Sequence, residues 1–161
     1  MNLLLRAVFT VSTLLVSYAS LAGGASRPVE PQRLADVEGT FQRDRRSLKC
    51  DDTFGFRADV DAGRLESISL GPTLGRILNI NSGSTYRESG TTFQSFTKAN
   101  KVVRTGFTTD FLTTHREVLT LAVKETKDQY VLKIDVRRRT YLVNMFPTDG
   151  GSFRCNYSRA K

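Results

Sequence analysis

The chain has 161 residues and a formal net charge of +8, with two cysteines, one histidine and no tryptophan. This length suits one domain of ordinary size rather than two. A single histidine and one pair of cysteines are too few ligands for a zinc cluster, so we expect no metal site and no cofactor.

The first 22 residues are typical of an export signal. Arg6 supplies a positive charge, an apolar run from Ala7 to Ala22 follows, and small residues end that run. Cleavage after Ala25 and an uncleaved anchor are the alternatives. We expect a secreted or periplasmic protein whose mature form has no transmembrane span and, without residues 1–22, a net charge of +7.

The two cysteines favour a disulfide over a free reactive thiol. In an oxidising compartment, a single pair of cysteines forms a bond by default. Cys50 and Cys155 are the only partners available, and they stand 105 positions apart. Their bond would join the first third of the chain to its last alternating segment, residues 152–158.

Residues 23–36 differ from the rest of the chain. They are mostly polar, include Pro28 and Pro31, and have no apolar periodicity. This composition predicts an N-terminal arm or linker, with at most a short helical turn through residues 31–35. Residues 37–161 are then the single folded domain.

From residue 37 onward, apolar and polar side chains alternate in short segments. The expected strands begin at Gly39 and cover residues 39–43, 54–60, 64–70, 76–80, 84–88, 91–97, 102–107, 117–124, 130–136, 140–146 and 152–158. Turn residues separate them, as at Asp61–Gly63 and Pro147–Gly151. We therefore predict an all-β antiparallel meander that closes into a barrel of roughly eight to ten strands, because closure removes exposed edges. A two-sheet β-sandwich is the alternative.

Two short motifs resemble lipocalins and their calycin relatives. Gly39-Thr40-Phe41 stands where that family has a Gly-x-Trp signature, and Thr109-Asp110-Phe111 resembles its Thr-Asp-Tyr signature. Phenylalanine replaces the family's usual ring in both motifs. The resemblance implies an eight-stranded barrel with an apolar ligand cavity.

No motif for catalysis surrounds the histidine. A Ser-His-Asp or Cys-His device would need His115, which follows two threonines at the start of a strand. We therefore expect a protein that is not an enzyme. Asn156-Tyr157-Ser158 matches an N-glycosylation sequon, whose use depends on the organism.

Basic residues cluster in three regions that are remote in sequence. A hairpin about residues 148–151 would place Arg137–Arg139 beside Arg159 and Lys161, and the disulfide would add Lys49. The predicted patch consists of Arg45, Arg46, Lys49, Arg137, Arg138, Arg139, Arg154 and Arg159. Such a patch attracts anionic lipid, acidic polysaccharide or an acidic protein, and the alternative is a solvated surface. We do not expect nucleic acid, because no stacking aromatics interleave with the basic residues.

The aromatic residues have two interpretations as well. They either fill the core or line a ligand cavity. The candidate lining residues are Phe54, Phe56, Phe93, Phe96, Tyr130 and Tyr141.

Two hypotheses for function follow. The first is an exported, non-enzymatic binding protein for a small apolar ligand or an anionic envelope or extracellular partner. The second is a protein–protein interaction module, such as an inhibitor of a secreted hydrolase or an envelope-associated structural protein. An inhibitor would present a long exposed loop, for which residues 107–116 are the candidate.

Overall fold

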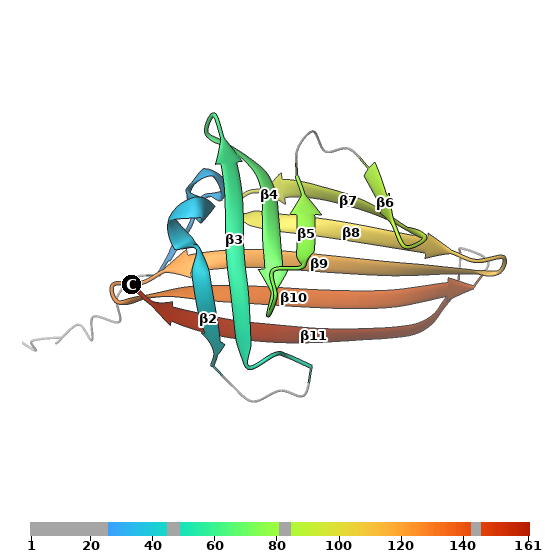
Figure 1. The fold of residues 1–161 in the computed structure, drawn as a ribbon. Helices are drawn as coiled ribbons and strands as arrows, with labels where there is room; N and C mark the ends of the chain where they lie inside the picture. Colours follow the sequence, from blue (N-terminus) through green and yellow to red (C-terminus); the bar gives the residue numbers. More distant parts are fainter. Residues whose placement is uncertain (1–25, 45–48, 81–84, 143–145) are drawn as a thin grey trace, which may run out of the picture.

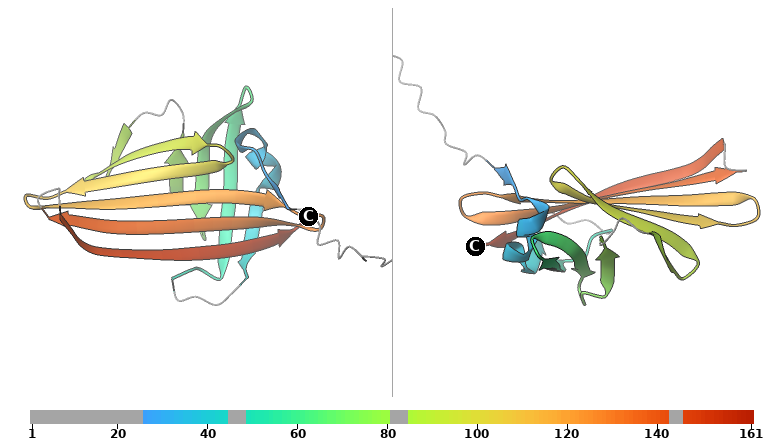
Figure 2. Two further views of the ribbon diagram at one scale, coloured as in Figure 1. Left: turned by 180° about the vertical axis from the view of Figure 1, so that it is seen from behind. Right: turned by 90° about the horizontal axis from the view of Figure 1, so that it is seen from above.

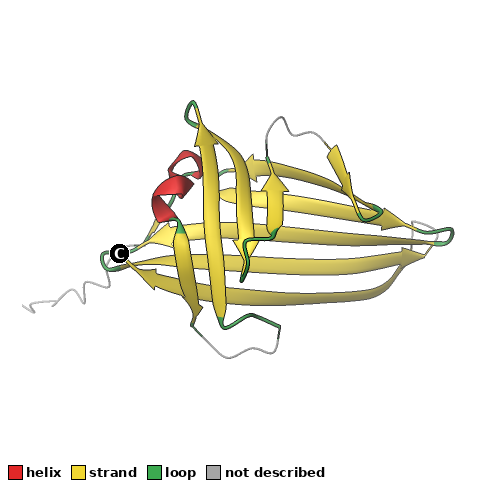
Figure 3. Ribbon diagram, in the orientation of Figure 1, coloured by secondary structure: helices red, strands yellow, loops and turns green. Residues whose placement is uncertain are grey.

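A computed structural model describes residues 26–44, 49–80, 85–142 and 146–161, and nearly all of these belong to strands (Figures 1 and 3). The predicted signal, Arg45 and Arg46 lie outside the described residues. The elements are β1 (Arg27–Pro28), η1 (Pro31–Val37), β2 (Gly39–Arg43), β3 (Thr53–Asp61), β4 (Arg64–Gly71), β5 (Arg76–Asn79), β6 (Thr85–Glu88), β7 (Thr91–Lys98), β8 (Lys101–Thr109), β9 (Thr113–Glu125), β10 (Gln129–Leu142) and β11 (Phe146–Ala160). Within the described ranges, no helix has the length and apolar character needed to cross a membrane.

The strands form one antiparallel sheet, which confirms the predicted all-β meander. Their order is β5-β4-β3-β2-β11-β10-β9-β8-β7-β6, with β1 added against the end of β9. The first long segment of the meander, β2, therefore lies beside the last, β11, as in an up-and-down barrel. β5 and β6 are the two ends of this order and are not paired with each other. The curled sheet is therefore a half-barrel rather than a closed barrel. Between these two strands, the Tyr86 hydroxyl donates a hydrogen bond to the Ile77 carbonyl at 3.4 Å.

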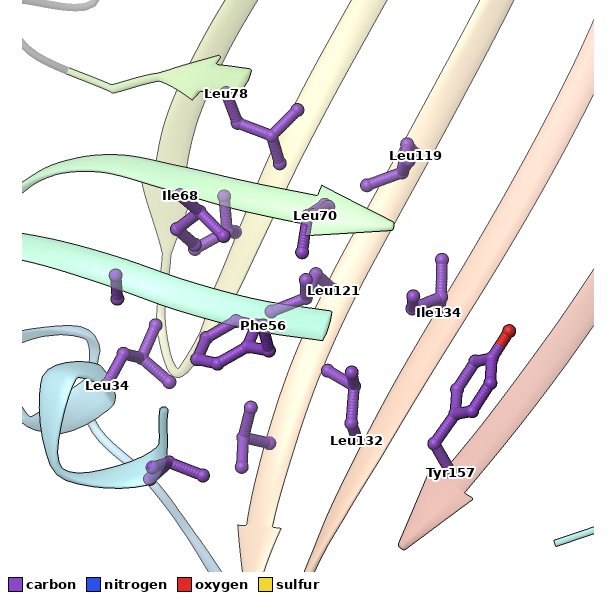
Figure 4. Packing of buried hydrophobic residues seen from close by; sticks show 14 of the residues in the cluster. Leu34, Phe56, Ile68, Leu70, Leu78, Leu119, Leu121, Leu132, Ile134 and Tyr157 are labelled. Atoms are coloured by element: carbon purple, nitrogen blue, oxygen red, sulfur yellow. The ribbon is translucent and has the colours of Figure 1, made fainter. Parts of the chain in front are cut away.

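The core lies between two parts of this curled sheet. Strands β2–β5 run across the longer strands β7–β11, and the view from above separates the two layers (Figures 1 and 2). Phe56 and Leu70 from one layer face Leu121 and Leu132 from the other, and all are buried (Figure 4). Each side chain of this size contributes roughly 1.5–3 kcal/mol when buried. The layers are therefore held together by apolar contact at one end of the long strands.

Two tight turns lie where the sequence predicts them, between β3 and β4 and between β6 and β7. Ala62 and Gly63 have φ angles of 46° and 77°, and Ser89 and Gly90 have 49° and 81°. Two-residue hairpin turns need left-handed residues at both positions, because their twist then matches that of the strands. The predicted turn at 81–83 lies outside the described residues.

The N-terminal arm is packed rather than free. β1 pairs with β9, and the predicted turn at 31–35 forms the 3-10 helix η1. Val29, Leu34 and Val37 are buried in the core. Their spacing fits neither a strand nor an α-helix, which is why periodicity did not identify them as core residues.

The predicted strand 130–136 and the start of the predicted strand 140–146, through Leu142, are one strand, and the predicted turn at Pro147–Gly151 is wrong. β10 runs from Gln129 to Leu142, and β11 already begins at Phe146. β2 pairs with β11 only at Tyr157 and Ser158, so the first part of β11 is an edge of the sheet within the described residues. An edge tolerates glycine and proline, and Pro147 lies beside a register irregularity.

The predicted disulfide is confirmed. Cys50, just before β3, is bonded to Cys155 in β11, with the two Cα atoms 5.8 Å apart. The Arg43 side chain donates hydrogen bonds to the Cys50 carbonyl and to the Asp52 carboxylate beside it. Since the β2–β11 pairing is only two residues long, the bond secures a short junction. A disulfide also fits folding in an oxidising compartment.

Candidate functional site: a groove inside the half-barrel

The inner face of β7–β11 changes from apolar to polar along the strands. Side chains in register across an antiparallel sheet form rows on each face. The apolar row consists of Val102, Leu121, Ile134 and Cys155, and the mixed row of Ser95, Arg104, Leu119, Val136 and Phe153. The charged row consists of Phe93, Gly106, Glu117, Arg138 and Gly151, and the hydroxyl row of Thr91, Thr108, His115, Thr140 and Asp149.

Two adjoining hollows lie along these rows. An inner cavity of about 600 Å³ lies between the two layers, where Phe54, Leu70 and Val136 line it. An outer groove of about 740 Å³ lies over the charged and hydroxyl rows. Both are lined by Phe93 and Arg138, so they adjoin each other, and each volume is typical of a small-molecule site. We call the two hollows together the groove: apolar residues such as Leu70 and Val136 line its inner end beside Arg104 and Arg138, and the hydroxyl row lines its open end.

A charge network forms the floor between the two ends. Arg104 is only 4% exposed; its Nη2 lies 3.2 Å from Glu117 Oε1, and its guanidinium lies 4.4 Å from the centre of the Phe93 ring. Arg138 Nε donates to the other oxygen of Glu117 at 2.9 Å. One carboxylate thus serves two guanidinium groups, and these three side chains carry a net positive charge. Such a floor favours an anionic group in the groove.

Two glycines shape the charged row. A Cβ on Gly106 would stand 2.7 Å from the Phe93 ring, so glycine allows this ring to lie flat over the strand. A Cβ on Gly151 would meet nothing within 4 Å, which means that it would project into open space in the groove. Gly151 therefore keeps the open end wide.

The hydroxyl row is hydrogen-bonded. Thr91 and Thr108 Oγ1 atoms are 2.7 Å apart, and His115 Nδ1 is 3.0 Å from Thr140 Oγ1. His115 Nε2 is 3.8 Å from the Asp110 carboxylate, and both side chains are more than half exposed. A hydroxyl, an imidazole and a carboxylate thus stand in series, but water surrounds them, unlike the enclosed groups of a hydrolytic triad. Among the described residues, no three His, Cys, Asp or Glu side chains gather as metal ligands.

The predicted cavity aromatics separate in the structure. Phe54 and Phe93 line the inner cavity, whereas Phe56 belongs to the solid core. Tyr130 packs against the core as well. Phe96 and Tyr141 lie away from the groove and border two other hollows, of about 890 Å³ and about 190 Å³.

The three basic regions do not converge as predicted, because β10 and β11 pair in a different register from the one expected. Arg137 pairs with Ser152, and Arg159 pairs with Tyr130, so Arg137 and Arg159 lie toward opposite ends of the β10–β11 hairpin. The reason is that the two strands are joined beyond Leu142 rather than at residues 148–151. Arg159 points inward, with its guanidinium 5.7 Å from the centre of the Phe41 ring. Lys49 and Arg138 do share the groove.

The groove also contains residues that our sequence analysis missed, above all Arg104 and Glu117. The sequence did mark both residues as unusual. Each is a charged residue at an inward position of its strand, where the neighbouring inward residues, such as Val102 and Leu119, are apolar. A charged residue at a core position indicates a partner across the sheet. The partner could not be named without the register.

The prediction of a long exposed loop at residues 107–116 is also wrong. Phe107–Thr109 end β8, and Thr113 already begins β9, which leaves only three residues between the strands. The Asp110 amide donates to the Thr113 carbonyl at 2.8 Å and closes this turn. The inhibitor hypothesis therefore loses the feature on which it rested.

Tyr157 should set an alkaline limit to stability. Burial, and to a lesser degree the Asp51 carboxylate, raise the pKa of Tyr157 above its ordinary value near 10. The fold favours the neutral phenol, so its stabilising effect is complete below about pH 10 and is lost as the pH rises through the raised pKa. We expect the free energy of unfolding in urea to fall more steeply above pH 10 in the wild type than in Tyr157→Phe. Equal slopes would contradict this assignment.

No protein-family model, curated protein or solved structure matches this chain. The description of the fold as a half-barrel rests on the order and pairing of its strands. The two lipocalin-like motifs have different surroundings: Phe41 is buried in β2, whereas Phe111 is fully exposed after β8.

Proposed function

We propose that the protein is an exported, non-enzymatic binding protein whose groove holds a small amphipathic molecule. The observation that carries this proposal is the gradient along the inner face, from the apolar row to the charged row. The apolar part of the ligand would occupy the inner cavity, and an anionic group would lie near Arg138. The resemblance to lipocalins, whose barrels have apolar ligand cavities, points in the same direction.

Two physical terms support such a ligand. An alkyl chain gains roughly 0.8 kcal/mol for each buried CH₂ group, and the inner cavity offers Leu70, Val136 and Phe153 as contacts. The anionic group gains from the net positive charge on Arg104, Glu117 and Arg138. A neutral apolar molecule would use only the first term.

The substitution Gly151→Phe tests whether the groove is the binding site. The new ring would project into the open space above the charged row without steric conflict at Cβ. We expect a fluorescent long-chain fatty acid to bind the wild type and to bind this variant about tenfold more weakly or worse. Titration monitored by fluorescence measures the affinity.

Ala122→Phe is the matched control, since Ala122 lies in β9 on the opposite face of the same sheet. It should bind the fatty acid like the wild type. If both variants bind normally while remaining folded, the groove is not the site.

Arg138→Gln tests the anionic end. Hydrogen bonds to a charged group contribute about 1.5–3 kcal/mol, so we expect the fatty acid to bind at least about tenfold more weakly. Binding of its uncharged methyl ester should not change. Arg57→Gln is the control, because the two arginine side chains are equally exposed, 62% and 63%, and Arg57 lies in β3 outside the groove. A parallel loss for acid and ester would contradict the assigned role.

A further inference from the structure

The outer face of β9–β11 is strongly basic. Residues on this face alternate with the buried residues of the inner face, as Lys133 and Arg137 alternate with Ile134 and Val136. Its charged residues are Arg116, Lys124, Lys133, Asp135, Arg137, Arg139 and Arg154. Asp135 is the one acid among them, and Arg154 already binds it. Seen from behind, no other described element covers this face (Figure 2).

Two like charges on this face destabilise the pairing of β9 with β10. Arg139 lies directly opposite Arg116 in the β9–β10 register, and like charges in such positions destabilise strand pairing. The guanidinium of Arg116 lies 5.5 Å from the centre of the neighbouring Phe107 ring, so it extends along the surface. An anionic surface opposite this pair would relieve the repulsion.

An apolar tip adjoins the basic pair. It consists of Phe111, Leu112, Leu142 and Phe146. The register brings them together, because Leu142 pairs with both Thr113 and Phe146 at one end of the sheet. Phe111 is 99% exposed and Leu112 56% exposed. Large apolar side chains gathered in this way at one end of a sheet indicate an interaction site.

We propose that this end of the protein docks on an anionic lipid bilayer. The apolar tip would enter the interface between head groups and acyl chains, while Arg116 and Arg139 contact anionic head groups. A soluble acidic polysaccharide would gain from the arginines but not from the tip, which is why we choose the bilayer. The hydroxyl row lies next to the tip, so docking would bring the open end of the groove to the lipid. Arg116 and Arg139 also border the outer groove, whereas the apolar tip does not, so the tip is the part of the docking surface that is separate from the ligand site.

Flotation of the mature protein with lipid vesicles tests the proposal. We expect binding to vesicles of phosphatidylcholine with added phosphatidylglycerol and little binding to phosphatidylcholine alone. Each basic side chain near an anionic surface contributes roughly a fivefold gain, so the pair Arg116→Gln and Arg139→Gln should weaken binding about 30-fold. The pair Phe111→Ser and Leu112→Ser should weaken it about tenfold or more.

Matched controls lie elsewhere on the surface. Ile77→Ser removes an apolar side chain that is 50% exposed on β5, close to the 56% of Leu112. Arg57→Gln with Arg64→Gln removes two exposed charges from β3 and β4. Both controls should bind vesicles normally, and circular dichroism should show that every variant is folded.

Two results would overturn the proposal. One is equal binding to both kinds of vesicle. The other is unchanged vesicle binding by the tip variant together with full competition by soluble dextran sulfate, which would identify a general polyanion surface. Gly151→Phe should still bind vesicles, so the groove and the docking surface can fail separately.

Discussion

Removal of the Cys50–Cys155 disulfide is expected to lower the free energy of unfolding by about 4 kcal/mol. The bond closes a loop between residues 105 positions apart, and a long loop restricts the unfolded chain more than a short one. The bond also secures the junction of β2 and β11, where, among the described residues, Arg43–Tyr157 and Gln42–Ser158 are the pairs in register. No other contact in the described chain constrains its unfolded state in this way.

Urea unfolding of the double variant Cys50→Ala and Cys155→Ala measures this loss. The wild type unfolded in the presence of a reducing agent is the control, and it should lose a similar amount. The dependence of the free energy on urea should also steepen, because an unfolded chain without the cross-link exposes more surface. A loss below about 1 kcal/mol would mean that the bond is not what holds the junction.

Glu117→Gln is expected to destabilise the protein by about 3 kcal/mol. This substitution leaves the guanidinium of Arg104 buried without its counter-charge, and breaking a buried pair costs about 3–5 kcal/mol. Glu117 keeps 23% of its side chain exposed, which places the expected loss at the lower end of that range. Its second partner, Arg138, lies at the surface and adds little.

A double variant distinguishes the cost of an unpaired buried charge from a loss of stability that any substitution at this site would cause. Arg104→Met combined with Glu117→Gln should be more stable than Glu117→Gln alone, since the buried charge is then gone. Asp59→Asn provides the control, because its pair with Arg57, at 3.8 Å, is exposed on both sides. We expect the control to change the free energy of unfolding in urea by less than about 0.5 kcal/mol. If the double variant is the least stable of all, the network stabilises the groove in another way.

The site could be predicted in part. Phe54 and Phe93 were candidates as aromatic residues, and Lys49 and Arg138 as members of the predicted basic patch, and all four line the groove. The run Arg137–Arg139 resembled a loop between two strands, because three consecutive charges interrupt the apolar alternation. In one continuous strand, alternation instead sends Arg138 to the groove and the two flanking arginines to the outer face.

The sequence by itself determined the features that depend on local residue patterns, and the disulfide, for which only one pairing exists. Alternation with period two defined most of the strands, glycine-containing pairs defined the turns at 62–63 and 89–90, and two cysteines allowed only one disulfide. The tertiary structure alone decided the strand register and the place where the half-barrel opens. Register depends on which residue pairs with which across the sheet, and the position of one turn sets every pair in a hairpin. That is why the rows of the groove, and the separation of Arg137 from Arg159, emerge only in the folded chain.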